Sequence, residues 1–330
     1  MKTIRWGILG LGNIAKAFVT GLRAVPDAQV VAVGSRSLIK AQAFAAEFCP
    51  DHSVSAHGSY AALAADPAVD VIYIATPHPM HLADALLCLE AGKAVLCEKP
   101  IAVNAKQVEQ MIAVARRKQV FLMEAMWTRF LPVMVQVRQW LQEGAIGQPR
   151  QVAADFGFRG PWEPDGRLLN PAYAGGALLD VGIYPIAFAA MVFGAQPQSI
   201  GGTAHIGTTG VDEQAAISLG YVGGGQAALR CAIQTETPQQ ARIDGTEGSI
   251  VLPNKFWQAT TATLTAGTRN ETISLPHVAN GYEYEAMEVG RCLRAGIMES
   301  PIMPLAESLA LMRILDTLRQ QWGLRYPMDA

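Results

Sequence analysis

The first 125 residues alternate between short apolar runs and longer amphipathic stretches, and this alternation constrains the fold more than any other feature. Apolar or β-branched runs indicate buried strands at residues 3–9, 30–34, 69–75, 94–97 and 120–126. Helical patterns lie between them at residues 13–24, 38–48, 81–91 and 104–117. Because strands separated by helices need crossover connections, this region is predicted to be a doubly wound α/β domain with a mostly parallel sheet.

The pattern changes after residue 126. Helices are expected at residues 131–143 and 177–193, with a loop rich in glycine, proline and aromatic residues between them. After Pro197 apolar and polar residues alternate, which indicates an antiparallel sheet with one face solvated or covered by a partner. We therefore predict an α/β protein with two domains: a Rossmann domain over residues 1–126, and an α+β domain with a large, mostly antiparallel sheet over residues 127–330.

Composition excludes several classes of protein. Lys plus Arg number 26 and Asp plus Glu 28, so the basic excess of a nucleic-acid-binding protein is missing. No run of 18 apolar residues predicts a membrane span. The 5 cysteines contain no C-x-x-C pair, which favours the reducing cytoplasm over a disulfide framework or a structural zinc site. Only 16% of residues are charged, against about 25% typically, and a homo-oligomer is the simplest way to bury the extra apolar surface.

The first strand runs into Gly10-Leu11-Gly12-Asn13-Ile14-Ala15, a G-x-G-x-x-A pattern between a strand and a helix. Gly10 permits the tight turn, Gly12 lets a pyrophosphate approach the backbone, and Ala15 allows close packing of helix on strand. The helix that opens at Asn13 and Ile14 presents free N–H groups and its positive dipole end to the phosphates. The place of this glycine pattern, directly after the first strand and at the start of a helix, predicts a dinucleotide-binding site.

The end of the second strand distinguishes NADP from NAD. A carboxylate there would bind the ribose 2′-hydroxyl, but the sequence reads Gly34-Ser35-Arg36-Ser37. Arg36 can pair with a 2′-phosphate, Ser35 and Ser37 can donate hydrogen bonds, and Lys40 adds a second cation one turn later. NADP is therefore the predicted cofactor, with NAD as the alternative.

Two further loops follow strands at the edge where an open α/β sheet binds its ligand. Their candidates for cofactor contact are Thr76, Pro77, His78, His81, Glu98 and Lys99, the last two fixed by Pro100. His81 is expected to hydrogen-bond near the nicotinamide or to cap a helix. No third ligand stands at a suitable spacing from the two histidines, so no metal site is predicted.

Asp180 and Tyr184 are the clearest polar pair in an apolar helix, four residues apart on one expected face. A buried aspartate needs a partner, and Lys99 is the natural one. A cation about 4 Å from a phenol lowers its pKa, by an attraction of at most about 4 kcal/mol at an effective dielectric near 20. Tyr184 is therefore the predicted proton carrier, with Lys99 as its electrostatic partner and Asp180 as the third catalytic residue.

The chain resembles the glucose-fructose oxidoreductase, inositol dehydrogenase and MocA family over its whole length. The matching stretches are RWGILGLGNIA, SRS, HPMH, AGKAVLCEKP, FLMEAMWTRF, GGALLDVGIYP, TGVDEQ and ESPIMPLAES. The resemblance implies hydride transfer between a sugar-like or diol carbon and the nicotinamide, with Lys99 in the site. Much of the family has histidine at the position of Tyr184. In having a tyrosine there, this chain resembles the branch of the family that acts on trans-dihydrodiols and D-xylose. The family also implies a homodimer packed through the antiparallel sheets.

The leading hypothesis is thus an NADP-dependent dehydrogenase of a cyclic sugar such as D-xylose or of a trans-dihydrodiol. The alternatives are an NADPH-dependent keto-sugar reductase of the anhydrofructose type and a non-catalytic NADP-sensing regulator. The stretch 277–282 looks shorter than in animal members of the branch, where it contributes an aromatic residue to the pocket. Candidates for the substrate pocket are Trp127, Arg129, Phe156, Phe158, Trp162 and Trp257.

Overall fold

The computed structural model describes residues 2–50 and 53–329. Contacts within the chain divide it into two compact units. The first comprises residues 1–102, 106–130 and 278–308, and the second comprises residues 103–105, 131–277 and 309–330. The sequence-based domain ranges 1–126 and 127–330 remain predictions. The two compact units differ from these ranges because residues 278–308 pack in the first unit and residues 103–105 pack in the second.

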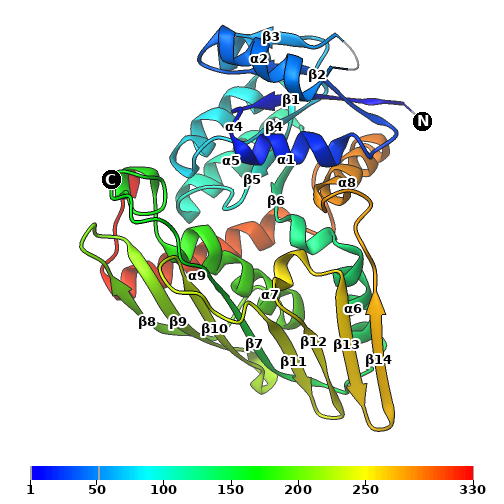
Figure 1. Cartoon of the computed structure of the whole chain (residues 1–330), viewed down its shortest axis with the longest axis vertical. Coiled ribbons are helices and arrows are strands. Elements are labelled where there is room, and N and C mark those ends of the chain that lie inside the picture. The colour runs from blue at the N-terminus through cyan, green and yellow to red at the C-terminus, as the bar shows by residue number, and fades with distance from the viewer. Residues whose placement is uncertain (1, 51–52, 330) are drawn as a thin grey trace. The chain divides into compact units, whose positions relative to one another are not determined.

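The first unit is built on a six-stranded parallel sheet in the order β3-β2-β1-β4-β5-β6 (Figure 1). Its strands are β1 (Ile4–Leu9), β2 (Ala28–Gly34), β3 (Ser55–His57), β4 (Val71–Ile74), β5 (Ala94–Glu98) and β6 (Leu122–Ala125). The order reverses between β1 and β4, which is the switch point where doubly wound sheets bind ligands. The predicted parallel α/β architecture is confirmed; β3 is too short to show in the hydrophobic pattern.

Helices connect these strands. They are α1 (Asn13–Leu22), α2 (Leu38–Phe48), α3 (Tyr60–Ala64), α4 (His81–Glu90) and α5 (Ala105–Lys118). An aromatic stack fixes α1 on the sheet: the ring of Phe18 lies 3.8 Å from that of Tyr73 in β4 and 5.2 Å from that of Trp6 in β1, between centroids. All three side chains are fully buried, so this stack forms the centre of the core.

A segment from far along the chain completes the first unit. Helix α8 (Tyr282–Ala295) packs on α1, where Gly21 leaves the space that Asn280 fills. The Asn280 amide donates to the carbonyl oxygen of Ala17 at 2.8 Å, and Arg294 pairs with Asp27 at 2.8 Å. A side chain on Gly21 would meet Asn280 Oδ1 at 2.5 Å, so this close approach requires glycine.

The second unit contains an eight-stranded sheet in the order β14-β13-β12-β11-β7-β10-β9-β8 (Figure 1). Its strands are β7 (Pro149–Gly157), β8 (Ser199–Ile206), β9 (Asp212–Gly220), β10 (Gln226–Ala232), β11 (Ala241–Gly245), β12 (Gly248–Leu252), β13 (Thr261–Ala266) and β14 (Arg269–Ser274). Only the β7–β10 pair is parallel. Ile217 and Leu219 of β9 pair with Leu229 and Ala227 of β10 on the buried face, which confirms the antiparallel pairing predicted after Pro197.

The helices of this unit are α6 (Pro132–Gln142), α7 (Ile183–Phe193) and most of α9 (Leu305–Trp322). The expected continuous α-helix over residues 177–193 is wrong in one respect, because Leu178–Gly182 forms a π-helical turn ahead of α7. Such turns insert an extra residue and occur often at functional sites. The stretch Pro171–Phe193 is long and apolar enough to cross a membrane, yet 83% of its most apolar window is buried, as in a core helix.

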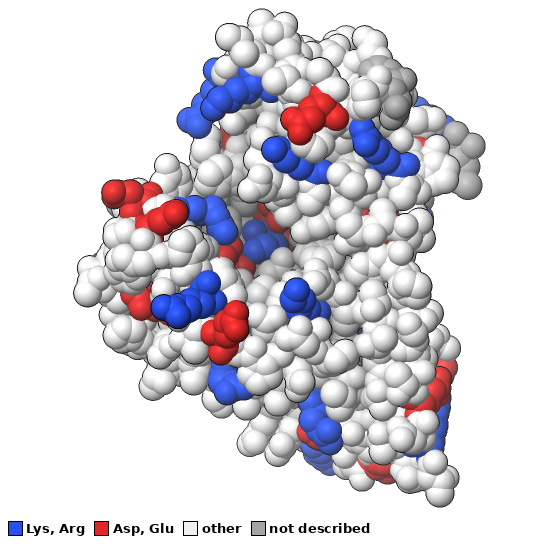
Figure 2. Space-filling view, in the orientation of Figure 1, with Lys and Arg blue, Asp and Glu red and all other residues white. Residues whose placement is uncertain are grey.

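Charged side chains are interspersed on the molecular surface. Figure 2 shows side chains of both charge signs scattered over the face in view, with wide uncharged areas between them.

Some charged groups that matter for the fold are instead buried. Glu124, at the end of β6, is 1% exposed, and its Oε1 accepts a hydrogen bond from the N–H of Ile101 at 3.0 Å. Burial raises the pKa of Glu124 to about 7.

This raised pKa makes the first unit less stable as the pH rises. The folded protein holds the proton of Glu124 up to about pH 7, whereas the unfolded chain releases it near 4.5, so stability falls across that window. Glu124→Gln stays neutral and keeps an acceptor for Ile101. We expect the variant to gain up to ~3 kcal/mol relative to wild type between pH 5 and pH 8.

Chemical denaturation at both pH values checks this difference. Glu47→Gln, at an exposed carboxylate of α2, controls for the loss of one negative charge. A difference between the Glu124 variant and wild type that is the same at pH 5 and pH 8 would contradict the expected titration.

Candidate functional site

The glycine-rich loop after β1 has the geometry of a phosphate cradle. Gly10 has φ +85°, and a Cβ there would lie 2.9 Å from Thr76 Cγ2 and 3.0 Å from the carbonyl of Ala75. At Gly12, by contrast, a Cβ would point into open space. Gly12 is also the N-cap residue of α1, and no side chain accepts a hydrogen bond from the first N–H groups of that helix. The loop therefore fits the pyrophosphate of a dinucleotide, which the free N–H groups and the helix dipole would bind.

The stretch after β2 places two exposed cations at the start of α2. Arg36 and Lys40 are exposed, whereas Ser35 and Ser37 are half-buried. Ser37 caps the helix, because its hydroxyl accepts a hydrogen bond from the N–H of Lys40 at 3.4 Å. Burial raises the pKa of Tyr60, and the neighbouring Arg36 opposes that effect. The arrangement leaves positive charge, and no carboxylate, in the stretch that follows β2.

His81 lies behind the loops that follow β4 and β5. Its Nε2 is 2.7 Å from the carbonyl oxygen of Thr76, and its Nδ1 is 2.9 Å from that of Pro100. The ring is fully buried, and burial lowers its pKa. His81 is the first residue of α4, but it does not cap the helix: Met80 holds the cap position, no side chain bonds there, and both ring nitrogens of His81 face backbone oxygens. His81 thus links the two loops, and any contact with a nicotinamide remains a prediction.

The side chain of Glu98 fixes the backbone of Lys99. Its Oε2 accepts the N–H of Lys99 at 3.1 Å, and its Oε1 accepts the hydroxyl of Tyr73. The neighbouring carboxyl of Glu285, on α8, is fully buried; burial raises its pKa well above the usual range, and Glu98 raises it further. Sequence reasoning missed Tyr73 and Glu285, because nothing in the local pattern links them to Glu98.

In the second unit an aromatic cluster lies beside Tyr184, near the start of α7, and Phe156 is its central member. The ring of Phe156 lies 5.5 Å from that of Tyr184, 3.4 Å from that of Trp257 in a stack, and 6.4 Å from that of Phe158, between centroids. Tyr184 is 7% exposed. Phe156 therefore links the predicted proton carrier to two further aromatic candidates, Trp257 and Phe158, whereas Trp162 is 53% exposed on the loop before α7.

Asp180 has an ion-pair partner that the sequence analysis did not identify. Arg167 Nη1 lies 2.7 Å from Asp180 Oδ1, and Nη2 donates to Oδ2 at 3.4 Å. Burial lowers the pKa of Arg167, but Asp180 more than offsets this and the pKa is raised. The guanidinium offsets the negative charge that a buried carboxylate would otherwise place beside Tyr184.

The π turn that carries Asp180 is held at its start by Asp212. The Oδ2 atom of Asp212 accepts a hydrogen bond from the N–H of Leu178 at 2.6 Å. A Cβ atom on Gly176 would lie only 2.1 Å from the Oδ1 atom of Asp212. Gly176 also has φ +119°, so both the space and the backbone require glycine. This explains why a double glycine precedes the predicted catalytic residues.

Two more candidates for the substrate pocket lie in the first unit. Trp127 is buried, and its ring stacks on that of Tyr282 at 4.5 Å between centroids. Tyr282 is thus an aromatic residue supplied by the end of the 277–282 stretch. Arg129 is 6% exposed and pairs with Glu307 at 2.5 Å. That buried pair gives Arg129 a structural role, and its contact with substrate remains a prediction.

The first unit therefore groups the predicted cofactor residues with Lys99, and the second groups Asp180 and Tyr184 with the aromatic cluster. The pairing of Lys99 with Tyr184 remains a prediction. Among residues 2–50 and 53–329, no three His, Cys, Asp or Glu side chains come together as a possible metal site.

Comparison with known proteins gives the family. The oxidoreductase family with an NAD-binding Rossmann fold matches residues 4–126, and the GFO/IDH/MocA C-terminal domain matches residues 134–251. The chain is 44% identical to trans-1,2-dihydrobenzene-1,2-diol dehydrogenase of Mus musculus and 42% identical to that of Homo sapiens, each over 99% of both chains.

Solved structures agree with this assignment. KijD10, a 3-ketoreductase from Actinomadura kijaniata crystallised with NADP and TDP-benzene, superposes with a TM-score of 0.83 at 27% identity, covering 97% of this chain and 98% of that one. Aldose-aldose oxidoreductase from Caulobacter crescentus shares the fold, with a TM-score of 0.88 at 23% identity and 97% coverage of each chain. The chain belongs to the GFO/IDH/MocA family and is an NAD(P)-binding dehydrogenase.

Proposed function

We propose that this protein is an NADP-dependent dehydrogenase that oxidises a cyclic diol or a sugar-like alcohol, such as a trans-dihydrodiol or D-xylose. The observation that carries the proposal is the aromatic cluster around Tyr184, with Phe156 stacked on Trp257. Flat aromatic faces bind the apolar face of a ring-shaped substrate, and a phenol beside them can exchange a proton with the substrate hydroxyl. The identity to dihydrodiol dehydrogenases over the full length supports the same substrate class.

The residues of this chain divide the reaction between them. Tyr184 takes the proton from the substrate hydroxyl during oxidation and returns it during reduction. Lys99, whose backbone Glu98 holds, favours the phenolate form by its charge. Asp180, paired with Arg167, stands one turn before Tyr184 and orients the polar groups around it. When bound, NADP supplies the nicotinamide that accepts the hydride.

A keto-sugar reductase is the second candidate. The 3-ketoreductase that superposes on this chain at 27% identity favours it, since the same proton carrier serves both directions. The two candidates differ in which substrate is turned over at low concentration. An assay of NADP reduction with D-xylose and a trans-dihydrodiol, run beside NADPH oxidation with a panel of keto sugars, compares them directly.

The roles of Lys99 and Tyr184 are tested by removing one functional group at a time. Lys99→Met and Tyr184→Phe should each lower kcat by at least about 100-fold, because each removes part of the proton transfer. The dissociation constant for NADPH, measured by fluorescence titration, should change by less than about threefold. Lys106→Met, at an exposed lysine, is the matched control. Retention of full activity by both variants would show that other groups move the proton.

The preference for NADP is tested at Arg36. Loss of a charge-assisted contact to a phosphate costs about 1.5–3 kcal/mol, so Arg36→Ala should raise the KM for NADP about 10- to 100-fold. The KM for NAD should stay nearly unchanged, because NAD has no 2′-phosphate. Steady-state kinetics with both cofactors give the comparison, and an equal rise in the two KM values would rule out the phosphate contact.

We also propose a homodimer formed through the exposed face of the eight-stranded sheet. Small uncharged side chains meet there on adjacent strands: Ala228 of β10 is opposite Ser218 of β9 and Ala153 of β7. All three are exposed. A flat row of small side chains lets two sheets approach closely, and such a face on an antiparallel sheet is open to a second copy.

Ala228→Arg should therefore convert the dimer to a monomer, because a charged side chain would be buried without a partner in the interface. Light scattering coupled to size-exclusion chromatography measures the mass. Ala46→Arg, at an exposed alanine of α2, should leave the dimer intact. A wild-type protein that elutes as a monomer, or an Ala228 variant that remains a dimer, would refute this interface.

A further inference from the structure

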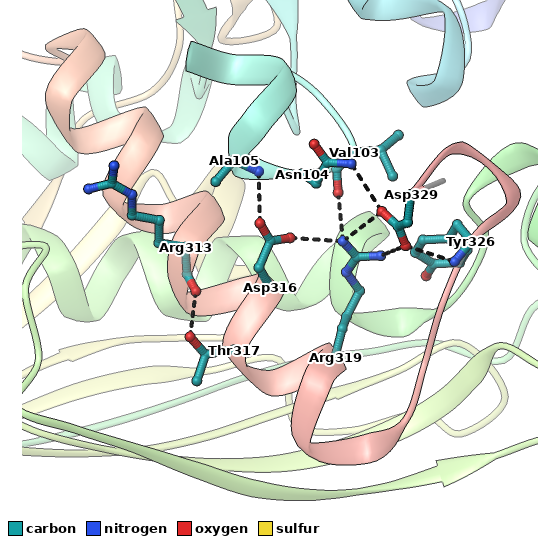
Figure 3. A network of polar contacts seen from close by, with 9 residues as sticks. All are labelled: Val103, Asn104, Ala105, Arg313, Asp316, Thr317, Arg319, Tyr326 and Asp329. Carbon is teal, nitrogen blue, oxygen red and sulfur yellow. Dashed lines mark hydrogen bonds and ion pairs between the residues drawn. The ribbon is translucent and has the colours of Figure 1, made fainter. Parts of the chain in front are cut away.

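Arg319, a buried residue of α9 in the second unit, holds three separate segments of the chain together (Figure 3). Its side chain is 5% exposed. The guanidinium donates to Asp316 Oδ1 at 2.8 Å in its own helix, to Asp329 Oδ2 at 2.7 Å in the C-terminal turn, and to the carbonyl oxygen of Val103 at 3.2 Å. A buried arginine with this many charge-assisted bonds is a rigid anchor.

One of the three segments comes directly after the loop of Lys99. Val103 stands four residues beyond Lys99 in the chain. The next two residues are held by the same carboxylates, because the N–H of Ala105 donates to Asp316 Oδ2 at 2.8 Å and the amide of Asn104 donates to Asp329 Oδ1 at 3.0 Å. The stretch of chain that leaves the Lys99 loop is therefore fixed on the second unit.

The same anchor reaches the stretch that precedes the other predicted catalytic residues. The guanidinium of Arg319 lies over the ring of Tyr326, 4.9 Å from its centroid. Tyr326 is 3% exposed, and its hydroxyl donates to the carbonyl oxygen of Gly175 at 2.5 Å. Gly175 leads directly into the π turn that carries Asp180 and on to Tyr184.

Asp212 adds a second contact at that end. It accepts the N–H of Leu178 at the start of the π turn, and its Oδ1 occupies the space beside Gly176. Burial raises the pKa of Asp212 to about 7, and the charge of Arg319 acts in the opposite direction. Arg319 and Tyr326 are thus coupled to the start of the π turn through both a hydrogen bond and a charge interaction.

We propose that Arg319, Asp316 and Tyr326 form a clamp within the second unit that positions Asp180 and Tyr184. The clamp holds residues 103–105 and the chain that precedes Asp180 on one rigid anchor. This rests on the proposed function, because the roles of Asp180 and Tyr184 come from there. None of the three clamp residues is assigned a contact with substrate or cofactor. Their effect is on alignment, where an error of about 1 Å can cost 10²-fold in rate.

The test uses two mild variants at opposite ends of the clamp. Tyr326→Phe removes only the hydroxyl that bonds to Gly175, and Asp316→Asn removes only the charge that holds Ala105 and Arg319. Hydrogen–deuterium exchange is followed at residues 101–105 and 175–180 in each full-length variant. Tyr221→Phe is the matched control, since its hydroxyl is buried and has no hydrogen-bond partner among the residues the structure describes.

We expect each variant to raise the exchange rate at both segments by at least about threefold, because the clamp transmits the change from one end to the other. The kcat should fall about tenfold with the NADPH dissociation constant unchanged, and the double variant should lose less than the product of the two single effects. Exchange that rises only beside the substituted residue, or an unchanged kcat in an active enzyme, would overturn the clamp.

The two proposals fail in distinguishable ways. A wild-type protein that turns over no sugar or diol contradicts the proposed function, whereas the exchange pattern still decides whether the two segments are coupled. Tyr221→Phe must behave as wild type in both measurements, because a loss there would show that any buried tyrosine hydroxyl in this unit has the same effect.

Discussion

In a parallel sheet the carboxyl ends of all strands lie at one edge, and the chemistry of this protein depends on that constraint. The glycine loop follows β1, the Ser-Arg-Ser stretch follows β2, the Thr76–His81 loop follows β4, and Lys99 follows β5. The four central and edge strands β1, β4, β5 and β6 are short and almost fully buried, so they hold this edge rigidly. Loops that are far apart in sequence are thereby brought to one edge of the sheet, where the nucleotide site is predicted.

Buried polar groups stiffen that edge from behind. His81 links the loops after β4 and β5 through their carbonyl oxygens, and Glu98 ties the backbone of Lys99 to Tyr73. Glu124 holds the N–H of Ile101, two residues beyond Lys99. Each of these groups costs free energy to bury and is stabilised by its hydrogen bonds. The loops around Lys99 are therefore held in place by the hydrogen bonds of these buried side chains.

In the second unit an apolar helical stretch carries a few polar groups, Asp180 and Tyr184 among them. Gly175 lets the chain pass close to the backbone of Leu168, Gly176 lets it pass close to Asp212, and the π turn that follows carries Asp180 into a pair with Arg167. Tyr184 follows in the first turn of the regular helix, beside the ring of Phe156. The sheet that supports this helix also exposes a row of small side chains on adjacent strands, and this row is the face of the proposed dimer.

The sequence by itself determined the parallel α/β unit and predicted the phosphate loop, because strand and helix periodicity and turn glycines are local signals. It also supplied the aromatic candidates for the pocket, but only the fold brings Phe156 to the ring of Tyr184. It did not reveal the return of α8 to the first unit, the π turn, or the partners of Asp180, Glu98 and Glu124. Those depend on residues that meet only after folding, as when the hydroxyl of Tyr326 bonds to Gly175 across 151 positions of the chain. Local patterns specify which faces of the helices and strands are apolar. Tertiary packing alone decides which buried polar groups meet, because a polar group that is buried without a hydrogen-bond partner costs free energy and each one must therefore find a partner in the folded chain.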